Sequence, residues 1–230
     1  MHSKCYDSMD ESLEVTPQEL QEIICLLDRL GCTIEHASKK TILGHQGETA
    51  QWLFLILSGQ VKVAVVESNG QEKVLCINDK TIILGESGFF SRETYNATMI
   101  AKTDLDFIRI DHQHLKTAIM IYPTLAWKIM NSMGKKIYHL TCDIAELSFY
   151  DSYTRLCEKL LSLASENGSV NDKGEVVIEL RLTDEELAQL LATQREVITR
   201  HLGKLKKRGI LRRENQKIVI CDVSALKQDN

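Results

Sequence analysis

The chain has 230 residues, 43% of them hydrophobic, and a formal net charge of −4. This length and composition predict one or two domains with real hydrophobic cores. No apolar run is as long as a membrane span, and the first residues lack the apolar segment of a signal peptide. We therefore expect a cytoplasmic protein that does not bind membranes.

Seven cysteines are spread along the chain without a CxxC pair, which argues against a zinc site or a dithiol redox centre. In a reducing compartment most of them should be small buried apolar residues. Residues 1–14 are polar and predict a loose tail, in which Cys5 is the best candidate for a reactive thiol.

The N-terminal half predicts one short helix followed by many short strands. The helix should begin at Thr16-Pro17, because proline suits the first turn of a helix. From Cys32 to about Asp111, apolar segments alternate with glycines, and Ser68-Asn69-Gly70 is a strong hairpin signal. This spacing predicts a small barrel or roll. The expected strands are residues 52–57, 61–66, 74–77, 81–84, 97–101 and 105–110.

After Pro123 the pattern becomes helical, and a long helix is predicted over residues 124–148. An apolar stripe at spacings of three and four fits a coiled-coil dimer seam, packing on the chain's own roll, or both. The stripe consists of Leu125, Ile129, Met133, Ile137, Leu140, Ile144 and Leu147. Asp151 is placed to cap a further helix over residues 152–165, and residues 176–182 should form a strand.

Residues 182–211 predict two helices joined by a tight turn. Thr183 with Glu186 is a capping box for the first helix, and Thr193 with Glu196 is a second box for the second helix. Gly209 stands where a helix C-cap belongs. The pattern is that of a helix-turn-helix, whose second helix is a candidate for the DNA major groove.

The second helix has two different faces. Its inward face should contain Ile198, Leu202 and Leu205, and its outward face contains Arg195, Glu196, Thr199 and Arg200. Arginine can donate two hydrogen bonds to guanine, and glutamate can accept one from cytosine. On an ordinary helix, the same charged residues would only form surface pairs.

Basic residues gather in the same region. Between Arg195 and Lys217 there are nine Lys or Arg against two Glu, so this segment carries +7 and the rest of the chain −11. Such a patch in an acidic protein indicates a phosphate-facing surface. Residues 210–213 and 218–221 should form a hairpin, which would be a wing.

A roll, a long helix and a winged helix-turn-helix, in that order, resemble the CRP/FNR family of bacterial transcription regulators. The likeness covers nearly the whole chain and is carried by LFLILSGQVKVAVV, GESGFF, Tyr153-Thr154-Arg155-Leu156 and LATQREVITRHL. It implies an α+β fold with an antiparallel β-roll (a double-stranded β-helix) over residues 1–111. A dimerisation helix over 112–149 and a winged helix-turn-helix over 150–230 would follow. It also implies an effector-gated homodimer that binds double-stranded DNA and contacts RNA polymerase.

In the cyclic-AMP receptors of this family, the recognition helix has the same RExxxR pattern as Arg195, Glu196 and Arg200. The resemblance therefore implies a palindrome with TGTGA-like arms whose centres are about one helical turn apart. The predicted DNA-binding residues are Thr183, Thr193, Gln194, Arg195, Glu196, Thr199, Arg200 and Lys204.

The sensor half departs from the cyclic-AMP pattern. Gly85-Glu86 match the start of the family's phosphate-binding cassette, but its arginine should fall where this chain has Tyr95-Asn96-Ala97, and Arg92 is three residues early. Leu140 and Thr141 stand where those receptors meet adenine, so only one hydroxyl remains. A phosphate without its cation is poorly held, so we expect an effector other than cyclic AMP.

The sensor is most similar to the halorespiration regulators, which sense chlorinated phenols. They share the run at Asn96-Ala97-Thr98 and place a lysine at Lys136. An ammonium there would favour a phenolate. The alternative is that Lys136 is an ordinary solvated helix lysine. The effector should bind between the roll and the long helix. Candidate residues are Gly85, Glu86, Tyr95, Asn96, Thr98, Lys136, Leu140 and Thr141.

The sequence also allows other functions. Cysteine oxidation could switch the regulator, or a cyclic nucleotide could be the effector after all. A module that regulates a partner enzyme would not need the winged helix-turn-helix. The N-terminus offers only Cys5 for an iron–sulfur cluster, and the seven histidines allow a haem ligand but point to none, so no cofactor or metal is predicted. No nucleophile–base pair, metal-ligand spacing or P-loop indicates an enzyme.

Overall fold

The computed structural model describes residues 13–68, 72–78 and 81–228, so Asn69 and Gly70 of the expected hairpin turn lie outside the described residues. The chain divides into two compact units, one ending at Ile137 and the other beginning at Tyr138.

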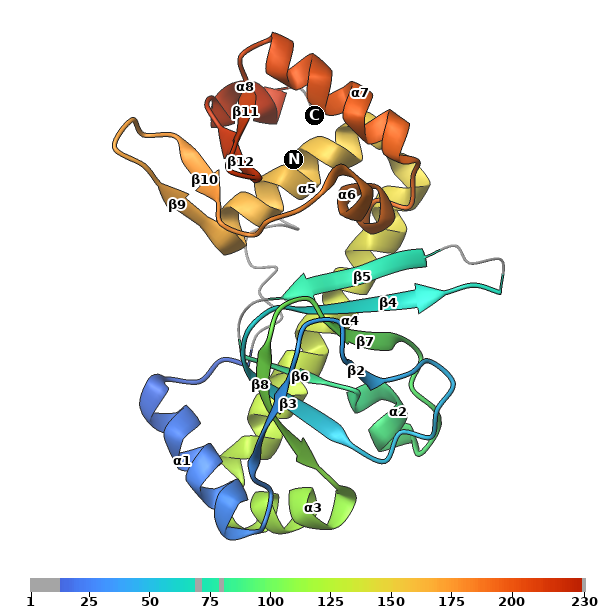
Figure 1. Ribbon diagram of the computed structural model, residues 1–230, viewed down its shortest axis with the longest axis vertical. Helices are drawn as coiled ribbons and strands as arrows, with labels where there is room; N and C mark the ends of the chain where they lie inside the picture. The colour runs from blue at the N-terminus through green and yellow to red at the C-terminus, as the bar shows by residue number, and fades with distance from the viewer. Residues whose placement is uncertain (1–12, 69–71, 79–80, 229–230) are drawn as a thin grey trace. The chain divides into compact units, whose positions relative to one another are not determined.

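The first unit is built on two four-stranded antiparallel sheets, with the orders β1-β8-β3-β6 and β2-β7-β4-β5 (Figure 1). The strands are β1 (Ile34–Ala37), β2 (Ile42–Gly44), β3 (Leu53–Ser58), β4 (Val61–Val66), β5 (Glu72–Asn78), β6 (Ile82–Leu84), β7 (Thr98–Ala101) and β8 (Leu105–Ile110). The predicted β-roll is confirmed. Strands β1 and β2 were not predicted. They are short and partly exposed, so their residues lack a strong apolar pattern.

Strand β3 is buried on both faces, and this explains its strong apolar pattern in the sequence. Phe54 and Ile56 point into a core between the two sheets, whereas Leu53 and Leu55 point into a second core against the helices. A strand buried on both faces reads as a continuous apolar run, as LFLILS does.

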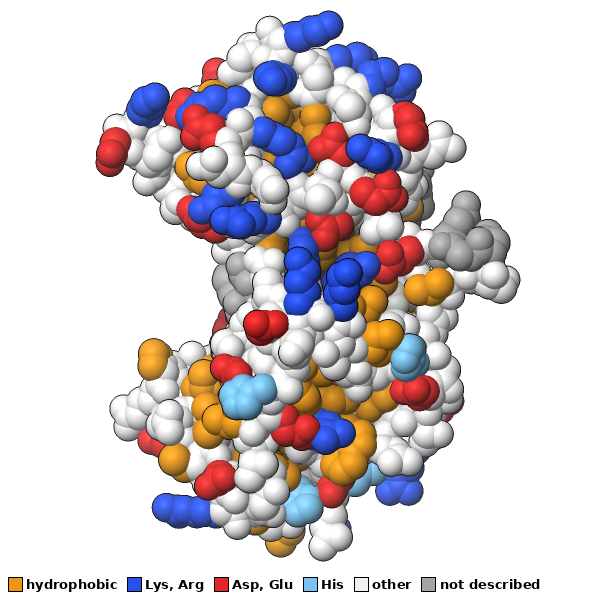
Figure 2. Space-filling view, viewed as in Figure 1, with side chains coloured by type: hydrophobic (Ala, Val, Ile, Leu, Met, Phe, Trp, Pro, Cys, Tyr) orange, Lys and Arg blue, Asp and Glu red, His pale blue; other side chains and the backbone are white. Residues whose placement is uncertain are grey.

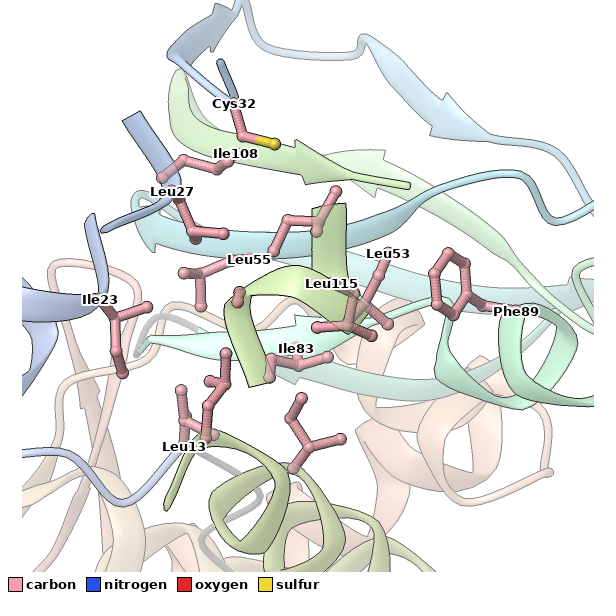
Figure 3. Close-up of a cluster of buried hydrophobic side chains, with 14 residues drawn as sticks. Leu13, Ile23, Leu27, Cys32, Leu53, Leu55, Ile83, Phe89, Ile108 and Leu115 are labelled. Atoms are coloured by element: carbon pink, nitrogen blue, oxygen red, sulfur yellow. The ribbon is translucent and has the colours of Figure 1, made fainter. Parts of the chain in front are cut away.

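Helices close one side of the roll. They are α1 (Pro17–Arg29), α2 (Glu86–Ser91), α3 (His112–Ile121) and the first part of α4 (Thr124–Phe149). Figure 3 shows Ile23 and Leu27 of α1 and Leu115 of α3 converging on Leu55. The prediction of a loose tail over residues 1–14 is wrong for Leu13. This residue is buried in the core, and its N–H donates to the Thr81 carbonyl at 2.8 Å.

The apolar stripe on α4 divides into two parts. Leu125 and Ile129 are each 3% exposed and belong to the core of the first unit. Ile137 is 63% exposed and Ile144 is 67% exposed. The first part is therefore core packing, whereas the later part lies on the surface of the chain. The side chain of Leu147 lies outside the described residues.

The second unit packs three helices and a terminal turn of helix on a four-stranded sheet of order β11-β12-β10-β9. Its elements are α5 (Ser152–Asn167), β9 (Gly168–Val170), β10 (Val176–Ile178), α6 (Asp184–Leu190), α7 (Arg195–Lys207), β11 (Leu211–Glu214), β12 (Lys217–Ile220) and α8 (Val223–Gln228). Asp151 caps α5 by accepting hydrogen bonds from the N–H groups of Tyr153 and Thr154.

The predicted strand over residues 176–182 is too long, since β10 ends at Ile178. β10 pairs with β9, which the sequence did not predict because GSV is short and exposed. The wing is confirmed, because β11 and β12 form a hairpin around Asn215 and Gln216, both with positive φ. Among the described residues, no helix combines the length and apolar character needed to cross a membrane.

Candidate DNA-recognition surface and effector site

The first helix of the helix-turn-helix begins as the sequence predicts. Thr183 Oγ1 accepts a hydrogen bond from the Glu186 N–H at 3.1 Å, and the Glu186 carboxylate accepts one from the Thr183 N–H at 2.9 Å. The capping box at Thr183 is therefore confirmed.

The second capping box, predicted at Thr193 and Glu196, is wrong. The Thr193 N–H donates to the Ala188 carbonyl at 3.0 Å, and Ala192 takes a left-handed φ of 47°. Both residues thereby terminate α6 in a Schellman arrangement. Helix α7 starts one residue later than predicted, with Gln194 at the N-cap and no side-chain capping bond.

The outward face of α7 carries the expected residues. Arg195, Glu196, Thr199 and Arg200 are all exposed, whereas Ile198, Leu202 and Leu205 are buried. Within the described part of the chain, Arg195 and Arg200 form no ion pair, so their guanidinium groups are available to a ligand. Lys204 lies over the Tyr153 ring, 5.8 Å from its centroid.

The basic residues of the wing are compensated within the chain. Arg212 holds Glu175 in a two-pronged pair at 2.5 and 2.7 Å, which lowers the pKa of Glu175 to about 2. Arg213 pairs with Asp184 at 2.7 Å, and Lys217 pairs with Glu179. Figure 2 shows acidic side chains interleaved with basic ones over this unit. The positive charge expected for the whole segment is therefore concentrated on α7.

Residues of the Tyr153-Thr154-Arg155-Leu156 run brace the helix-turn-helix. Arg155 donates from its NH1 group to the Leu191 carbonyl at the end of α6, at 2.8 Å. The Tyr153 ring packs edge-on against His201 of α7, with centroids 5.2 Å apart. These supporting roles could not be read from the sequence, because the contacting residues are more than 30 positions apart.

His201 is the histidine of helix α7, and it is buried. It is 6% exposed, and its Nε2 lies 3.0 Å from Ser152 Oγ, whereas its Nδ1 is buried without a partner in the described structure. Burial lowers the pKa of His201, and the neighbouring charges of Arg200 and Lys204 lower it further. The neutral imidazole is therefore the form that fits the fold.

In the sensor unit, Glu86 and Lys136 form an ion pair. Glu86 is the first residue of α2, and its Oε1 lies 2.9 Å from the Lys136 Nζ on α4. The same ammonium donates to the Ile83 carbonyl at 2.5 Å. Both side chains are only 15% exposed, so Lys136 is not a solvated surface lysine. The acidic residue that matches the cassette is held by a cation of the chain itself.

Tyr95 is the first residue of the run Tyr95-Asn96-Ala97, where the resemblance leads us to expect an arginine. It is 4% exposed, and its hydroxyl donates to the Trp52 carbonyl at 2.8 Å and accepts from the Trp52 N–H at 3.1 Å. Burial raises the pKa of this phenol. A Cβ at Gly44 would lie 2.8 Å from the ring, and one at Gly85, whose φ is +86°, would lie 3.0 Å from it. The Tyr95 hydroxyl is already hydrogen-bonded within the chain.

The remaining predicted effector residues belong to both units. Asn96 accepts a hydrogen bond from Ser87 at 2.9 Å, and Thr98 is buried and accepts one from the Gln46 N–H at 3.1 Å. Leu140 and Thr141 lie further along α4, in the other unit, and both are exposed. Their part in an effector pocket remains a prediction.

Arg92 does not replace the missing cassette arginine. It ends α2 with a left-handed φ of 59°, at the opposite end of this helix from Glu86. There it lines a surface hollow of about 460 Å³ together with Gln51 and His112.

No group of three or more metal-ligating side chains occurs among the described residues. Of the cysteines, Cys25 is exposed, while Cys32, Cys142 and Cys157 are buried. Cys5, the predicted reactive thiol, lies outside the described residues.

Two family descriptions match the two halves of this architecture. Residues 34–122 match the cyclic nucleotide-binding domain, and residues 154–229 match the Crp-like helix-turn-helix domain. The fold and the site thus define a DNA-binding transcription regulator with a nucleotide-binding-like sensor domain.

Several known proteins are similar to this chain over most of its length. The cAMP-activated global transcriptional regulator CRP of Salmonella typhimurium is 25% identical over 190 residues, which cover 82% of this chain and 90% of the relative. A CooA mutant structure from Carboxydothermus hydrogenoformans is 26% identical with a TM-score of 0.78, covering 94% of this chain and 98% of that one. A CprK variant complexed with OCPA shares the fold, with a TM-score of 0.73 at 17% identity and coverage of 92% and 93%. The chain belongs to the CRP/FNR family.

We predict that the stability of the winged unit depends on the protonation of His201. Because the folded state lowers this pKa, the unfolded chain binds a proton that the folded chain resists. The free energy of unfolding should fall as pH drops through about 6.5, the ordinary pKa of histidine. Asp151 opposes this effect, while Arg200 and Lys204 reinforce it.

The measurement is denaturant unfolding followed by circular dichroism at several pH values between neutral and mildly acidic. His201→Gln can keep the bond to Ser152 but cannot titrate, so its stability should change less over this interval. Parallel pH curves for the wild type and the variant would contradict the assignment.

Proposed function

We propose that this chain is an effector-responsive homodimeric regulator that reads a TGTGA-like palindrome and contacts RNA polymerase in the cytoplasm. Its effector would be a small molecule other than cyclic AMP, bound between the roll and the long helix, and the chain would carry no catalytic activity. The observation that supports DNA reading best is the uncompensated pair Arg195 and Arg200 flanking Glu196 on the exposed face of α7.

The second part of the proposal is a dimer along α4. Its exposed apolar residues recur at helical spacing: Trp127 (69% exposed), Met130 (56%), Ile137 (63%), Leu140 (51%) and Ile144 (67%). Gly134 falls within this stripe, where an added Cβ would meet nothing within 4 Å of its own chain. This exposed row differs from the stripe predicted from the sequence, because Leu125 and Ile129 of that stripe are in the core. Exposed apolar surface of this kind favours burial against a second copy.

The third part concerns the effector. Lys136 is the cation of the cassette region, and it stands between Glu86 and the Ile83 carbonyl. An acidic phenol or a similar anion could take the place of Glu86 as its partner, whereas a cyclic phosphate would find Tyr95 where its arginine belongs. This chemistry favours a compact organic anion, in line with the resemblance to the halorespiration regulators.

The DNA proposal predicts a sequence-dependent loss for Arg195→Ala. On a TGTGA-armed duplex the variant should lose about 1–3 kcal/mol for each half-site of the palindrome, the value of one base-reading contact per protomer. On a scrambled duplex it should lose much less. Fluorescence anisotropy at fixed salt measures both. Lys206→Ala, which removes an exposed lysine from the last turn of the same helix, should weaken both duplexes alike. An equal loss on both duplexes for Arg195→Ala would make Arg195 a phosphate contact only.

The dimer proposal predicts that Ile137→Asp separates the protomers. An unpaired carboxylate buried in the seam should raise the dimer dissociation constant by at least about a hundredfold. Analytical ultracentrifugation measures this, with circular dichroism to show that the variant is folded. Val170→Asp makes the same change at a position that is 72% exposed and lies off α4, and it should stay dimeric. A dimeric Ile137→Asp protein would place the interface elsewhere.

The effector proposal predicts that a chlorinated phenol tightens binding to the TGTGA-armed duplex and that cyclic AMP does not. Lys136→Met should abolish the response, because the anion loses its cation. Lys135→Met is the matched control, since that neighbouring ammonium pairs with Glu14 instead. Tightening by cyclic AMP alone would favour a nucleotide-responsive regulator, and tightening by an oxidant alone would favour the cysteine switch.

A further inference from the structure

One carboxylate connects three parts of the helix-turn-helix. Asp184 is the first residue of α6, and its Oδ2 accepts a hydrogen bond from Thr199 Oγ1 of α7 at 2.8 Å. Its Oδ1 accepts one from the Arg213 NH2 group of β11 at 2.7 Å. Arg213 also donates from its NH1 group to the Leu182 carbonyl at 2.8 Å. Asp184 thus links the recognition helix to the wing.

The position of this carboxylate conflicts with a surface that binds DNA. Thr199 follows Arg195 by four residues, so both lie on one face of α7. A carboxylate that touches Thr199 therefore lies beside the face that meets the double helix. Its negative charge would repel a nearby phosphate.

Arg213 is the group for which Asp184 and DNA would compete. The Asp184 side chain is 26% exposed and the Arg213 side chain is 32% exposed, so the pair is open to an approaching phosphate. Arginine binds carboxylate and phosphate with the same two-pronged geometry. While Arg213 is paired with Asp184, its charge is compensated and contributes little to the general attraction of DNA.

We propose that Asp184 is a specificity-determining positioning residue: its carboxylate acts as an internal competitor that keeps Arg213 from binding DNA phosphate. The inference rests on the proposed DNA-binding function. By reducing the sequence-independent part of the affinity, this carboxylate raises the relative weight of base reading by α7.

The test compares Asp184→Asn with Glu185→Gln on a scrambled duplex and on a TGTGA-armed duplex. Both variants remove one negative charge from the same turn, but Glu185 is exposed and makes no contact with arginine in the described structure. Asparagine keeps an oxygen for Thr199 while losing the charge that holds Arg213. Anisotropy titrations over a range of salt concentrations give the affinity and its salt dependence.

Asp184→Asn should tighten the scrambled duplex by roughly threefold to tenfold at low salt, and by more than Glu185→Gln does. The slope of log K against log salt should become steeper by about 0.9 for each protomer of the dimer, as expected for one more neutralised phosphate per protomer. The preference for the TGTGA-armed duplex should fall accordingly. In Asp184→Asn/Arg213→Gln, the extra affinity and the extra slope should both disappear.

Several results would overturn the inference. Asp184→Asn could behave like Glu185→Gln, or its gain could persist in the double variant, and either result would leave only a general charge effect. If Asp184→Asn fails to fold, Asp184→Ser serves instead, because serine also suits the start of a helix. Failure of the proposed DNA-binding function would give a different result, because neither the wild type nor any variant would then bind a duplex.

Discussion

The ion pair between Glu86 and Lys136 is the interaction on which the sensor depends. Both charges are largely removed from water, and such charges persist only when each is compensated. The Ile83 carbonyl satisfies the ammonium further, so α2, β6 and α4 meet at one nitrogen atom. An effector that took the place of Glu86 on this ammonium would also remove the attachment of α2 to the long helix. This gives the proposed switch a physical basis.

In both units, basic side chains at the candidate sites are paired with acidic side chains of the chain itself. In the roll, Lys136 neutralises the acidic residue that matches the cassette, and buried Tyr95 stands in place of an arginine. In the winged unit, the arginines of β11 are neutralised by Glu175 and Asp184. The uncompensated basic groups that remain are concentrated on α7. If the proposed sites are right, binding in each unit exchanges one anionic partner for another, which would make it selective as well as attractive.

The sequence predicted the elements whose pattern is local. The strand around Phe54 is an apolar run buried on both faces, and the capping box at Thr183 needs only four residues. A local rule failed at Thr193, because the same residue was required to end the preceding helix. The pairs that control the sites could not be predicted, since they join distant positions: Lys136 lies 50 residues from Glu86. Periodicity revealed the stripe on α4 but not which part of it the roll would cover.

The coupling between Glu86 and Lys136 is the most direct test of this account. A double-mutant cycle with Glu86→Gln, Lys136→Met and the double variant, followed by denaturant unfolding of the roll, isolates their interaction. We predict that each single variant is destabilised and that the double variant is more stable than the sum of the two losses implies, by about 1–3 kcal/mol. Additive losses would contradict the account, because they would show that the two charges do not hold each other and that Lys136 is not the organising cation of the sensor.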